Sequence, residues 1–182
     1  KDYSMCNTFM NQSTHAGNYP GGGGYAQYVI VPQQNVEIGL ISIPEGISFD
    51  EACQVEIVNC CWRAVKESGI ESDDTALIVG QGPVGLTHTQ LVKRLVGAQV
   101  IATDLLDYRV EASQKIFEAD YAINPRQENV AEFVKQKTGG RGADLAIIVF
   151  ESVEAIQQGL NAVRRGGKVM VFGGAAVEKM IS

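Results

Sequence analysis

The sequence lacks an excess of basic residues and any long apolar run. Of its 182 residues, 15 are Lys or Arg and 21 are Asp or Glu, which gives a formal net charge of −6. An acidic balance without a basic cluster argues against nucleic acid and anionic membranes as partners. We find no signal peptide and no apolar stretch long enough to span a bilayer, so we expect no membrane location.

A disulfide framework is also missing. The chain has four cysteines, Cys6, Cys53, Cys60 and Cys61, and none of them forms a Cys-x-x-Cys pair. Adjacent cysteines such as Cys60 and Cys61 are poorly placed to bridge each other. The pattern is typical of reduced thiols and predicts a cytoplasmic protein.

The most informative stretch is Val-Gly-Gln-Gly-Pro-Val-Gly, from Val79 to Gly85. It has the spacing Gly-x-Gly-x-x-Gly, with an apolar run before it and a helical pattern after it. Strand, tight turn and helix in this order form the dinucleotide fingerprint, in which the helix N-terminus faces a pyrophosphate. We expect the first glycine to allow the turn, the second to let the backbone approach the pyrophosphate, and the third to let helix and strand pack closely. The candidate cofactor-binding residues here are Gly80, Gly82, Pro83, Val84 and Gly85.

A second signal follows at the end of the next predicted strand, where Asp104 comes after residues 99–103. A carboxylate at this position can accept hydrogen bonds from both hydroxyls of an adenosine ribose, and it would repel a 2′-phosphate. It therefore favours NAD over NADP. The alternative is that Asp104 only caps the next helix. Glycine-rich turns are common, so the prediction of cofactor binding depends on the two signals together.

After Asp73 the sequence alternates regularly between strand and helix patterns. The predicted strands lie near residues 75–80, 99–103, 121–123, 144–150 and 168–173. The predicted helices lie near residues 83–95, 109–117, 129–138 and 153–164. This alternation predicts an α/β fold with a doubly wound parallel sheet, of which five strands of six are visible.

The preceding part of the chain has a different pattern. Residues 24–32 are rich in aromatic and β-branched residues and predict a strand, whereas residues 51–67 predict a helix with Ser48 as its cap and Gly69 as its stop. We therefore expect two domains, residues 1–68 and residues 69–182.

Four stretches together resemble the zinc-dependent medium-chain dehydrogenases of the alcohol, polyol and threonine type. They are Gly24–Tyr28, Ile43–Ala52, Val79–Gly85 with Asp104, and the pair Thr138–Asp144 and Gly166–Val169. The resemblance covers nearly the whole chain. It implies part of a GroES-like β-rich catalytic domain, a linking helix and a Rossmann domain. Because Lys1 begins in the middle of the pattern, we expect a fragment that lacks the N-terminal zinc ligands and the C-terminal end.

The resemblance also implies roles for individual residues. Glu56 matches a glutamate that binds the catalytic zinc in the polyol branch, although Ile57 replaces the usual proline; the alternative is an exposed glutamate or one paired with an arginine. Arg109 matches a basic residue beside the adenosine ribose, and the alternative is a solvated arginine. Phe150 and the three residues after it depart from the family, which usually has a glycine-containing loop there, bordering the nicotinamide.

The predicted activity of the intact protein is hydride transfer between an alcohol or polyol and NAD. The resemblance implies a zinc ion that binds the alcohol oxygen and lowers its pKa, and an intact protein that is a homo-oligomer. We expect the fragment alone to bind NAD weakly or not at all and to be inactive. Two alternatives stay open: a zinc-free NADPH-dependent quinone or enoyl reductase, and a non-catalytic nucleotide-binding domain.

Overall fold

The structure, a computed structural model, describes residues 27–28, 31, 33–150 and 152–173. The chain divides into two compact units, residues 1–48 and residues 49–182. In the first unit the structure describes helix α2 (Gln33–Gly39), which the sequence patterns did not predict. The strand expected at residues 24–32 lies mostly outside the described residues, so the β-rich domain predicted for this part stays a prediction.

The second unit begins earlier in the chain than the boundary predicted between residues 68 and 69. It opens with helix α3 (Phe49–Ala52) and helix α4 (Val55–Ser68), where the sequence predicted one continuous helix. Helix α4 ends at Gly69, whose φ of 66° is the left-handed C-cap that the glycine predicts. Because α4 packs on the helix that follows the first strand, it belongs to the compact unit that holds the sheet. The predicted domain boundary itself stays a prediction.

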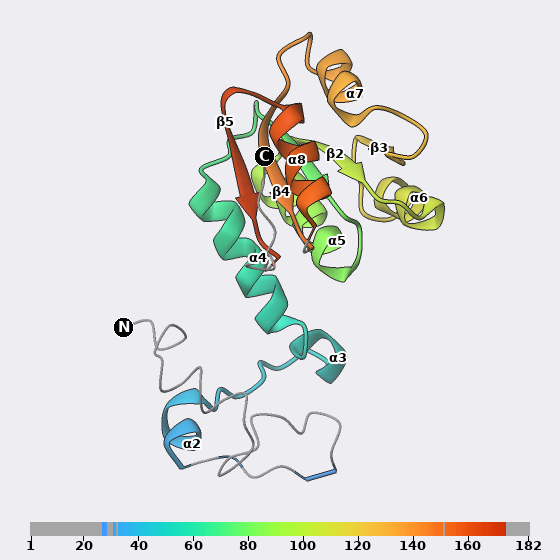
Figure 1. Cartoon of the computed structure of the whole chain (residues 1–182). Helices are drawn as coiled ribbons and strands as arrows, with labels where there is room; N and C mark the ends of the chain where they lie inside the picture. The colour runs from blue at the N-terminus through green and yellow to red at the C-terminus, as the bar shows by residue number, and fades with distance from the viewer. Residues whose placement is uncertain (1–26, 29–30, 32, 151, 174–182) are drawn as a thin grey trace. The chain divides into compact units, whose positions relative to one another are not determined.

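A parallel sheet of five strands forms the centre of this unit (Figure 1). The strands are β1 (Thr75–Val79), β2 (Gln99–Thr103), β3 (Tyr121–Ile123), β4 (Ala143–Ile148) and β5 (Val163–Val171). Their order is β3-β2-β1-β4-β5, and every neighbouring pair is parallel. This is the doubly wound order that the alternating pattern predicts. The order reverses between β1 and β4, so a ligand crevice is expected at the carboxyl ends of these two strands.

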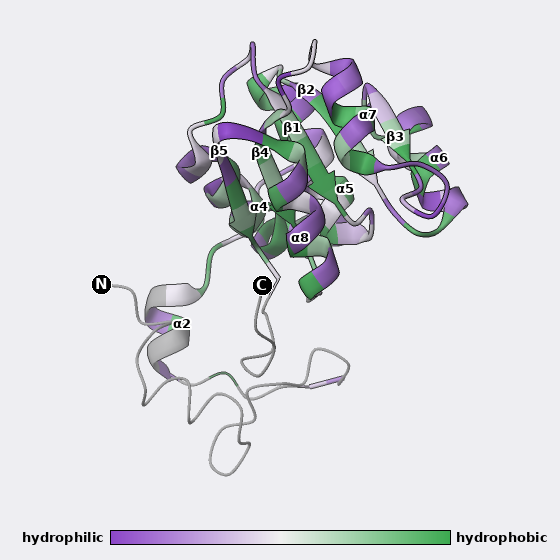
Figure 2. Cartoon of the chain, turned by 45° about the horizontal axis from the view of Figure 1, so that its top comes forward, coloured by the Kyte–Doolittle hydropathy of each residue, from purple (hydrophilic) through white to green (hydrophobic). Residues whose placement is uncertain are grey.

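Both faces of the sheet are covered, as the nearly all-apolar strands require. Leu77 and Val79 of β1 pack with residues of helices α7 (Val130–Lys137) and α8 (Val153–Ala162) on one face. The alternate residues of the same strand join α4 and α5 (Pro83–Leu91) on the other. Figure 2 shows the hydrophobic strands enclosed by helices whose outer surfaces are hydrophilic. The period of two along β1 therefore divides the core into two layers.

Several element bounds differ from the sequence patterns. Helix α5 ends at Leu91 and continues as one π-helical turn, η2 (Val92–Val96), and helix α6 spans Asp107–Lys115. Strand β5 begins at Val163, five residues before the predicted start, because residues 164–167 loop out between two paired positions. The glycines in that loop looked like a turn between elements, whereas they form an irregularity inside one strand.

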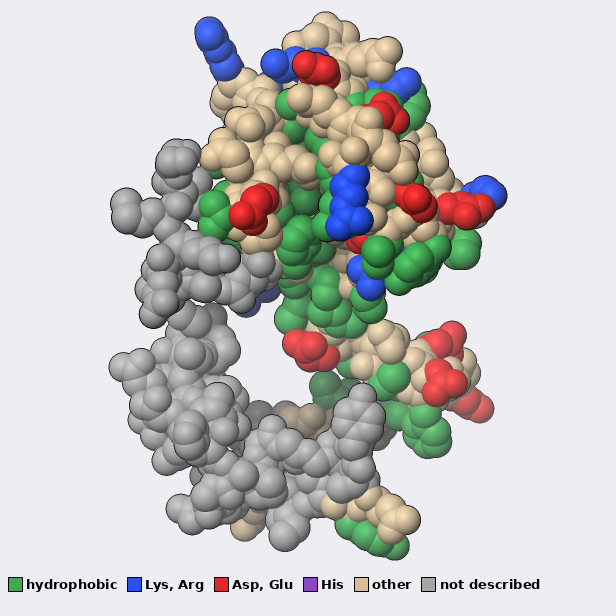
Figure 3. Space-filling view, turned by 45° about the vertical axis from the view of Figure 1, so that its right-hand side comes forward, with side chains coloured by type: hydrophobic (Ala, Val, Ile, Leu, Met, Phe, Trp, Pro, Cys, Tyr) green, Lys and Arg blue, Asp and Glu red, His purple; other side chains and the backbone are tan. Residues whose placement is uncertain are grey.

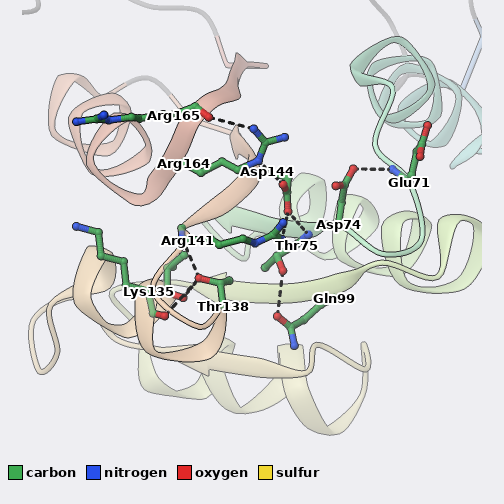
Figure 4. A network of polar contacts seen from close by, with 12 residues as sticks. Glu71, Asp74, Thr75, Gln99, Lys135, Thr138, Arg141, Asp144, Arg164 and Arg165 are labelled. Atoms are coloured by element: carbon green, nitrogen blue, oxygen red, sulfur yellow. Dashed lines mark hydrogen bonds and ion pairs between the residues drawn. The ribbon is translucent and has the colours of Figure 1, made fainter.

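The amino-terminal end of the sheet is tied together by Asp144, which lies at the start of β4 (Figure 4). Its carboxylate accepts hydrogen bonds from the Thr75 backbone N–H at 2.8 Å, from Arg141 at 3.2 Å and from Arg164 at 2.5 Å. Burial raises the pKa of Asp144, but the hydrogen bonds from Arg164 and Thr75 outweigh it, so the pKa lies below its ordinary value. The network joins β1, β4 and β5 at the end opposite the expected crevice.

The helices of the described residues include none whose length and apolar character would let it cross a membrane. Acidic and basic side chains are interspersed over the described part of the face shown in Figure 3, with hydrophobic side chains between them. The described part of that face carries no large patch of a single charge.

Candidate functional site

The glycine turn lies between β1 and α5, at the carboxyl end of the sheet. Gly80 has a φ of +96°, which favours glycine, and a methyl group on Gly85 would lie 1.8 Å from the carbonyl oxygen of Gly80. The third glycine of the fingerprint is therefore required by the close contact between strand and helix. At Gly82 the nearest atom to such a methyl group is Nη1 of Arg109, 3.8 Å away, so the backbone is open to a ligand.

The first turn of α5 is suited to an anion. Gly82 is its N-cap without a side-chain hydrogen bond, and Pro83 follows at the first helical position. The N-terminal N–H groups of a helix are not used within it, and together with the helix dipole they attract a phosphate. Val84 and Gly85 stand in this first turn. The residues predicted from the fingerprint are thus brought together around one open helix end.

Gln81, between the first two glycines, has a role that the sequence pattern did not predict. Its side chain is fully buried, donates to the carbonyl of Ile78 at 3.3 Å and accepts from the hydroxyl of Thr89 at 3.0 Å. The amide thus links the turn to both β1 and α5. The fingerprint leaves this position unspecified, so only the structure reveals that a buried side-chain amide stabilises the turn.

Asp104 lies beside this turn, directly after β2, and its side chain is only 8% exposed. One carboxylate oxygen accepts the backbone N–H of Gln81 at 2.7 Å, and the other accepts that of Leu106 at 3.0 Å. A carboxylate has about four acceptor positions, so each oxygen keeps one for a ligand hydroxyl. Capping of the next segment and ligand binding were alternatives for Asp104 in the sequence, and the geometry accommodates both.

Arg109, on α6, lies close to both Asp104 and the glycine turn. Its Nη1 atom lies 3.6 Å from the Asp104 carboxylate, and its Nε donates to the Tyr108 hydroxyl at 3.1 Å. The hydrogen bond to Tyr108 is the largest of the effects that raise the pKa of this guanidinium. The arginine is therefore a fixed positive charge between the acid and the glycine turn, although its side chain stays 37% exposed.

A cavity of about 500 Å³ opens at the carboxyl ends of β1, β2, β3 and β4, where the strand order predicts a crevice. Gly80, Asp104 and Arg109 line it together. Lining residues that the sequence analysis did not single out include Leu105, Leu106, Arg126 and Gln158. Residues directly after parallel strands could have been found from the strand pattern, whereas Gln158, inside α8, carries no such signal.

Glu56 lies apart from this cavity, in the first turn of α4, and it is exposed. It accepts a hydrogen bond from the Cys60 thiol at 3.1 Å, and that bond is the main cause that raises the pKa of Cys60. Among the described residues, no three His, Cys, Asp or Glu side chains lie together as a metal site requires. The residues that the structure describes therefore do not fit a zinc ion by themselves.

His88 is buried on α5 and is a packing residue. Its ring meets Phe172 edge to face at a centroid distance of 4.7 Å, and neither ring nitrogen has a hydrogen-bond partner. Burial lowers the pKa of His88 to about 4. The structure therefore places His88 in the core and not in the lining of the cavity.

The family model described as zinc-binding dehydrogenase matches residues 83–182, which is more than half of the chain. This chain belongs to the zinc-binding dehydrogenase family. The match begins at Pro83, the first residue of the helix that faces the open turn.

Relatives within this family support the assignment. The chain is 33% identical over 154 residues to sorbitol dehydrogenase of Bacillus subtilis strain 168, covering 85% of this chain and 42% of that protein. It is 33% identical over 152 residues to L-threonine 3-dehydrogenase of Caldanaerobacter subterraneus subsp. tengcongensis, covering 83% and 42%. The solved alcohol dehydrogenase of Thermus sp. ATN1 superposes with a TM-score of 0.70 and 26% identity, over 75% of this chain and 40% of that chain.

The chain thus spans less than half the length of the zinc-binding dehydrogenases it matches. The resemblance stated from the sequence is confirmed at the level of the family, and the α/β fold is confirmed by the parallel sheet. The roles of individual residues, from Gly80 to Arg109 and at Glu56, stay predictions.

Proposed function

We propose that this chain forms the cofactor-binding part of an oxidoreductase that transfers a hydride between an alcohol or polyol CH–OH group and NAD. One observation carries the proposal: the open turn at Gly82, the carboxylate of Asp104 and the guanidinium of Arg109 lie within reach of one another at the switch point of the sheet. These are the groups that a diphosphate and an adenosine ribose need. The named relatives are sorbitol, threonine and alcohol dehydrogenases, which supports an alcohol-type substrate.

In this proposal each residue has a separate task. The N–H groups at the start of α5 bind the diphosphate, and Arg109 offsets its negative charge. Asp104 accepts hydrogen bonds from the ribose hydroxyls with the acceptor positions that the backbone leaves free. Leu105 and Leu106 supply apolar surface for the adenine at the rim of the cavity. A bound nicotinamide would supply the acceptor for a hydride from the alcohol carbon.

NAD is preferred to NADP in this proposal because a 2′-phosphate would meet the carboxylate of Asp104. Arg126 lines the same cavity and is a reason to test the phosphorylated cofactor, which the alternative quinone or enoyl reductase would use. A non-catalytic nucleotide-binding domain is the other alternative. It shares the cavity and differs only in having no turnover.

We also propose Glu56 as one zinc ligand of the intact protein, as the resemblance implies, with the remaining ligands outside the described residues. Replacement by glutamine should then lower the zinc content of the longest natural form of the protein. Cytoplasmic location is supported by Cys53, Cys60 and Cys61, which are all free thiols. A homo-oligomer, in which second copies of the chain are the partners, is part of the same proposal.

The test has two stages. The 182-residue chain is titrated with adenine nucleotides, and the longest natural form of the protein is assayed for NADH formation with sorbitol, threonine and simple alcohols. We expect nucleotide binding that weakens when Asp104 is changed, and turnover with NAD in preference to NADP. Binding without turnover on any alcohol would favour the non-catalytic alternative, and turnover only with NADPH and a quinone or enoyl substrate would favour the reductase.

A further inference from the structure

Phe150 stands where β4 ends, and its ring lies against the first glycine of the turn. A methyl group on Gly80 would be 2.7 Å from Cδ1 and 3.0 Å from Cε1 of this ring. The ring therefore occupies the space that a side chain at position 80 would fill. The ring also lines the cavity, and it stays 41% exposed.

The backbone around Phe150 is held on two sides. The N–H of Val149 donates to the carbonyl of Val79 at 3.2 Å, which continues the pairing of β4 with β1 beyond the strand end. On the other side, a methyl group on Gly173 would lie within 2.9 Å of the N, Cα and C atoms of Phe150. A side chain at Phe150 must therefore extend from a fixed point between the ends of β1 and β5.

The cavity extends to only one side of Phe150. Its described lining residues lie at or after the carboxyl ends of β1, β2, β3 and β4, on α6, or on α8 and its N-cap, and none of them lies on α5 or β5. A dinucleotide at a switch point has one nucleotide on each side of the reversal in strand order. The cavity lies on the side of Asp104 and Arg109, and the ring of Phe150 lines it near the end of β4.

We propose that Phe150 is a specificity-determining residue that closes the cavity toward the ends of β4 and β5. The site then fits an adenosine diphosphate moiety better than a whole nicotinamide dinucleotide, and the second nucleotide docks only when the ring is absent or displaced. This inference rests on the proposed function, because it assumes that the cavity holds adenine nucleotides. It also gives a physical reason for the weak binding of NAD that we expect of this chain.

The experiment is calorimetric titration of the 182-residue chain with ADP and with NAD, in the wild type and in Phe150→Ala. We expect the wild type to bind ADP at least as tightly as NAD. The variant should bind NAD about tenfold more tightly, with the affinity for ADP unchanged within about twofold. Leu105→Ala is the matched control, since Leu105 lines the same cavity with 46% of its surface exposed and should change both affinities by the same factor.

Phe150→Leu, which keeps an apolar side chain in the same place, serves if the alanine variant does not fold, and it should give a smaller change in the same direction. Wild-type binding of NAD much tighter than of ADP, or equal losses of both ligands in the variants, would overturn the role of Phe150 while leaving the proposed function intact. Equal losses would identify the ring as a platform for adenine. Failure of the wild type to bind either nucleotide would overturn the proposed function and this inference with it.

Discussion

The Nη1 atom of Arg109 lies 3.6 Å from the Asp104 carboxylate and 3.8 Å from the point where a Cβ on Gly82 would stand. A single guanidinium thus connects the acid after β2 to the open turn after β1. Its charge is half-exposed, so water screens it in the free protein and a bound diphosphate would desolvate it. The affinity for phosphate-bearing ligands should therefore depend on this side chain.

Arg109→Gln should lower the affinity for ADP by about tenfold, because a charge-assisted hydrogen bond to phosphate is lost. Calorimetric titration measures the change. Arg94→Gln is the matched control, since Arg94 pairs with Glu118 on the surface at 2.8 Å and does not line the cavity. An affinity that is equal in the two variants would contradict the placement of the diphosphate beside Arg109.

Alanine should destabilise the protein strongly at Gly85 and hardly at all at Gly82. Gly85→Ala places a methyl group 1.8 Å from the Gly80 carbonyl and should lower the free energy of unfolding by about 3 kcal/mol or more. Gly82→Ala meets nothing closer than 3.8 Å at a φ of −75°, so its stability should change by less than about 1 kcal/mol while its affinity for ADP falls. Urea denaturation and titration with ADP of both variants measure these effects. Equal urea midpoints for the two variants would contradict the prediction.

Asp144→Ala should destabilise the sheet without affecting the cavity. The change removes the acceptor of the buried Thr75 N–H and of two arginines, for which a loss of about 2–4 kcal/mol is expected. Urea midpoints measure the loss, with Glu111→Ala as the control for a carboxylate in an exposed pair on α6. Because the network lies at the opposite end of the strands, the affinity of the folded variant for ADP should equal that of the wild type. A specific loss of affinity would contradict this separation.

His88 should make the fold sensitive to mild acid. Its pKa falls from 6.5 to about 4 on folding, so the unfolded chain binds the proton more readily between these values. Stability is therefore complete above pH 6.5 and declines as the pH falls toward 4, by about 3 kcal/mol in all. The pKa of Asp144 is lowered on folding, so its contribution is present above the ordinary value and is lost mainly at pH values below this window.

The measurement is the urea midpoint of the wild type and of His88→Leu across this pH range. Leucine removes the two unpartnered nitrogens, so the variant should be at least as stable at neutral pH and should lose much less on acidification. The same slope in both proteins would show that another group causes the acid sensitivity.

Regular features could be predicted from the sequence because they depend on periodicity. The apolar run at residues 144–150 and the glycine spacing at 80–85 specify strand, turn and helix locally, and the parallel order follows from the alternation. The bulge at residues 164–167 could not be predicted, since glycines mark a turn and an irregular strand equally well. The break between α3 and α4 was missed for a similar reason, because no glycine or proline marks it.

The site was predictable only where its residues stand in a motif. Gly80 and Asp104 were identified from spacing and Arg109 from the family resemblance, and the structure brings all three to one cavity. The buried amide of Gln81 was missed because the fingerprint leaves its position unspecified, although its partners Ile78 and Thr89 are close in the chain. Gln158 was missed because its position depends on a contact with Thr103, which is far away in the sequence. Glu56 was selected as a metal ligand from the family resemblance, and in the described structure it is exposed and hydrogen-bonded to Cys60.

The two backbone hydrogen bonds that Asp104 accepts have a consequence for redesign of coenzyme preference. To admit a 2′-phosphate beside this position, the acid would have to be exchanged for a small, uncharged residue. Here that exchange would leave the N–H groups of Gln81 and Leu106 without their acceptor, so the segments after β1 and after β2 would lose the carboxylate that both bind. A variant that accepts the larger coenzyme will therefore need a replacement acceptor introduced at the same time, so single substitutions at Asp104 should yield unstable proteins before they yield new selectivity.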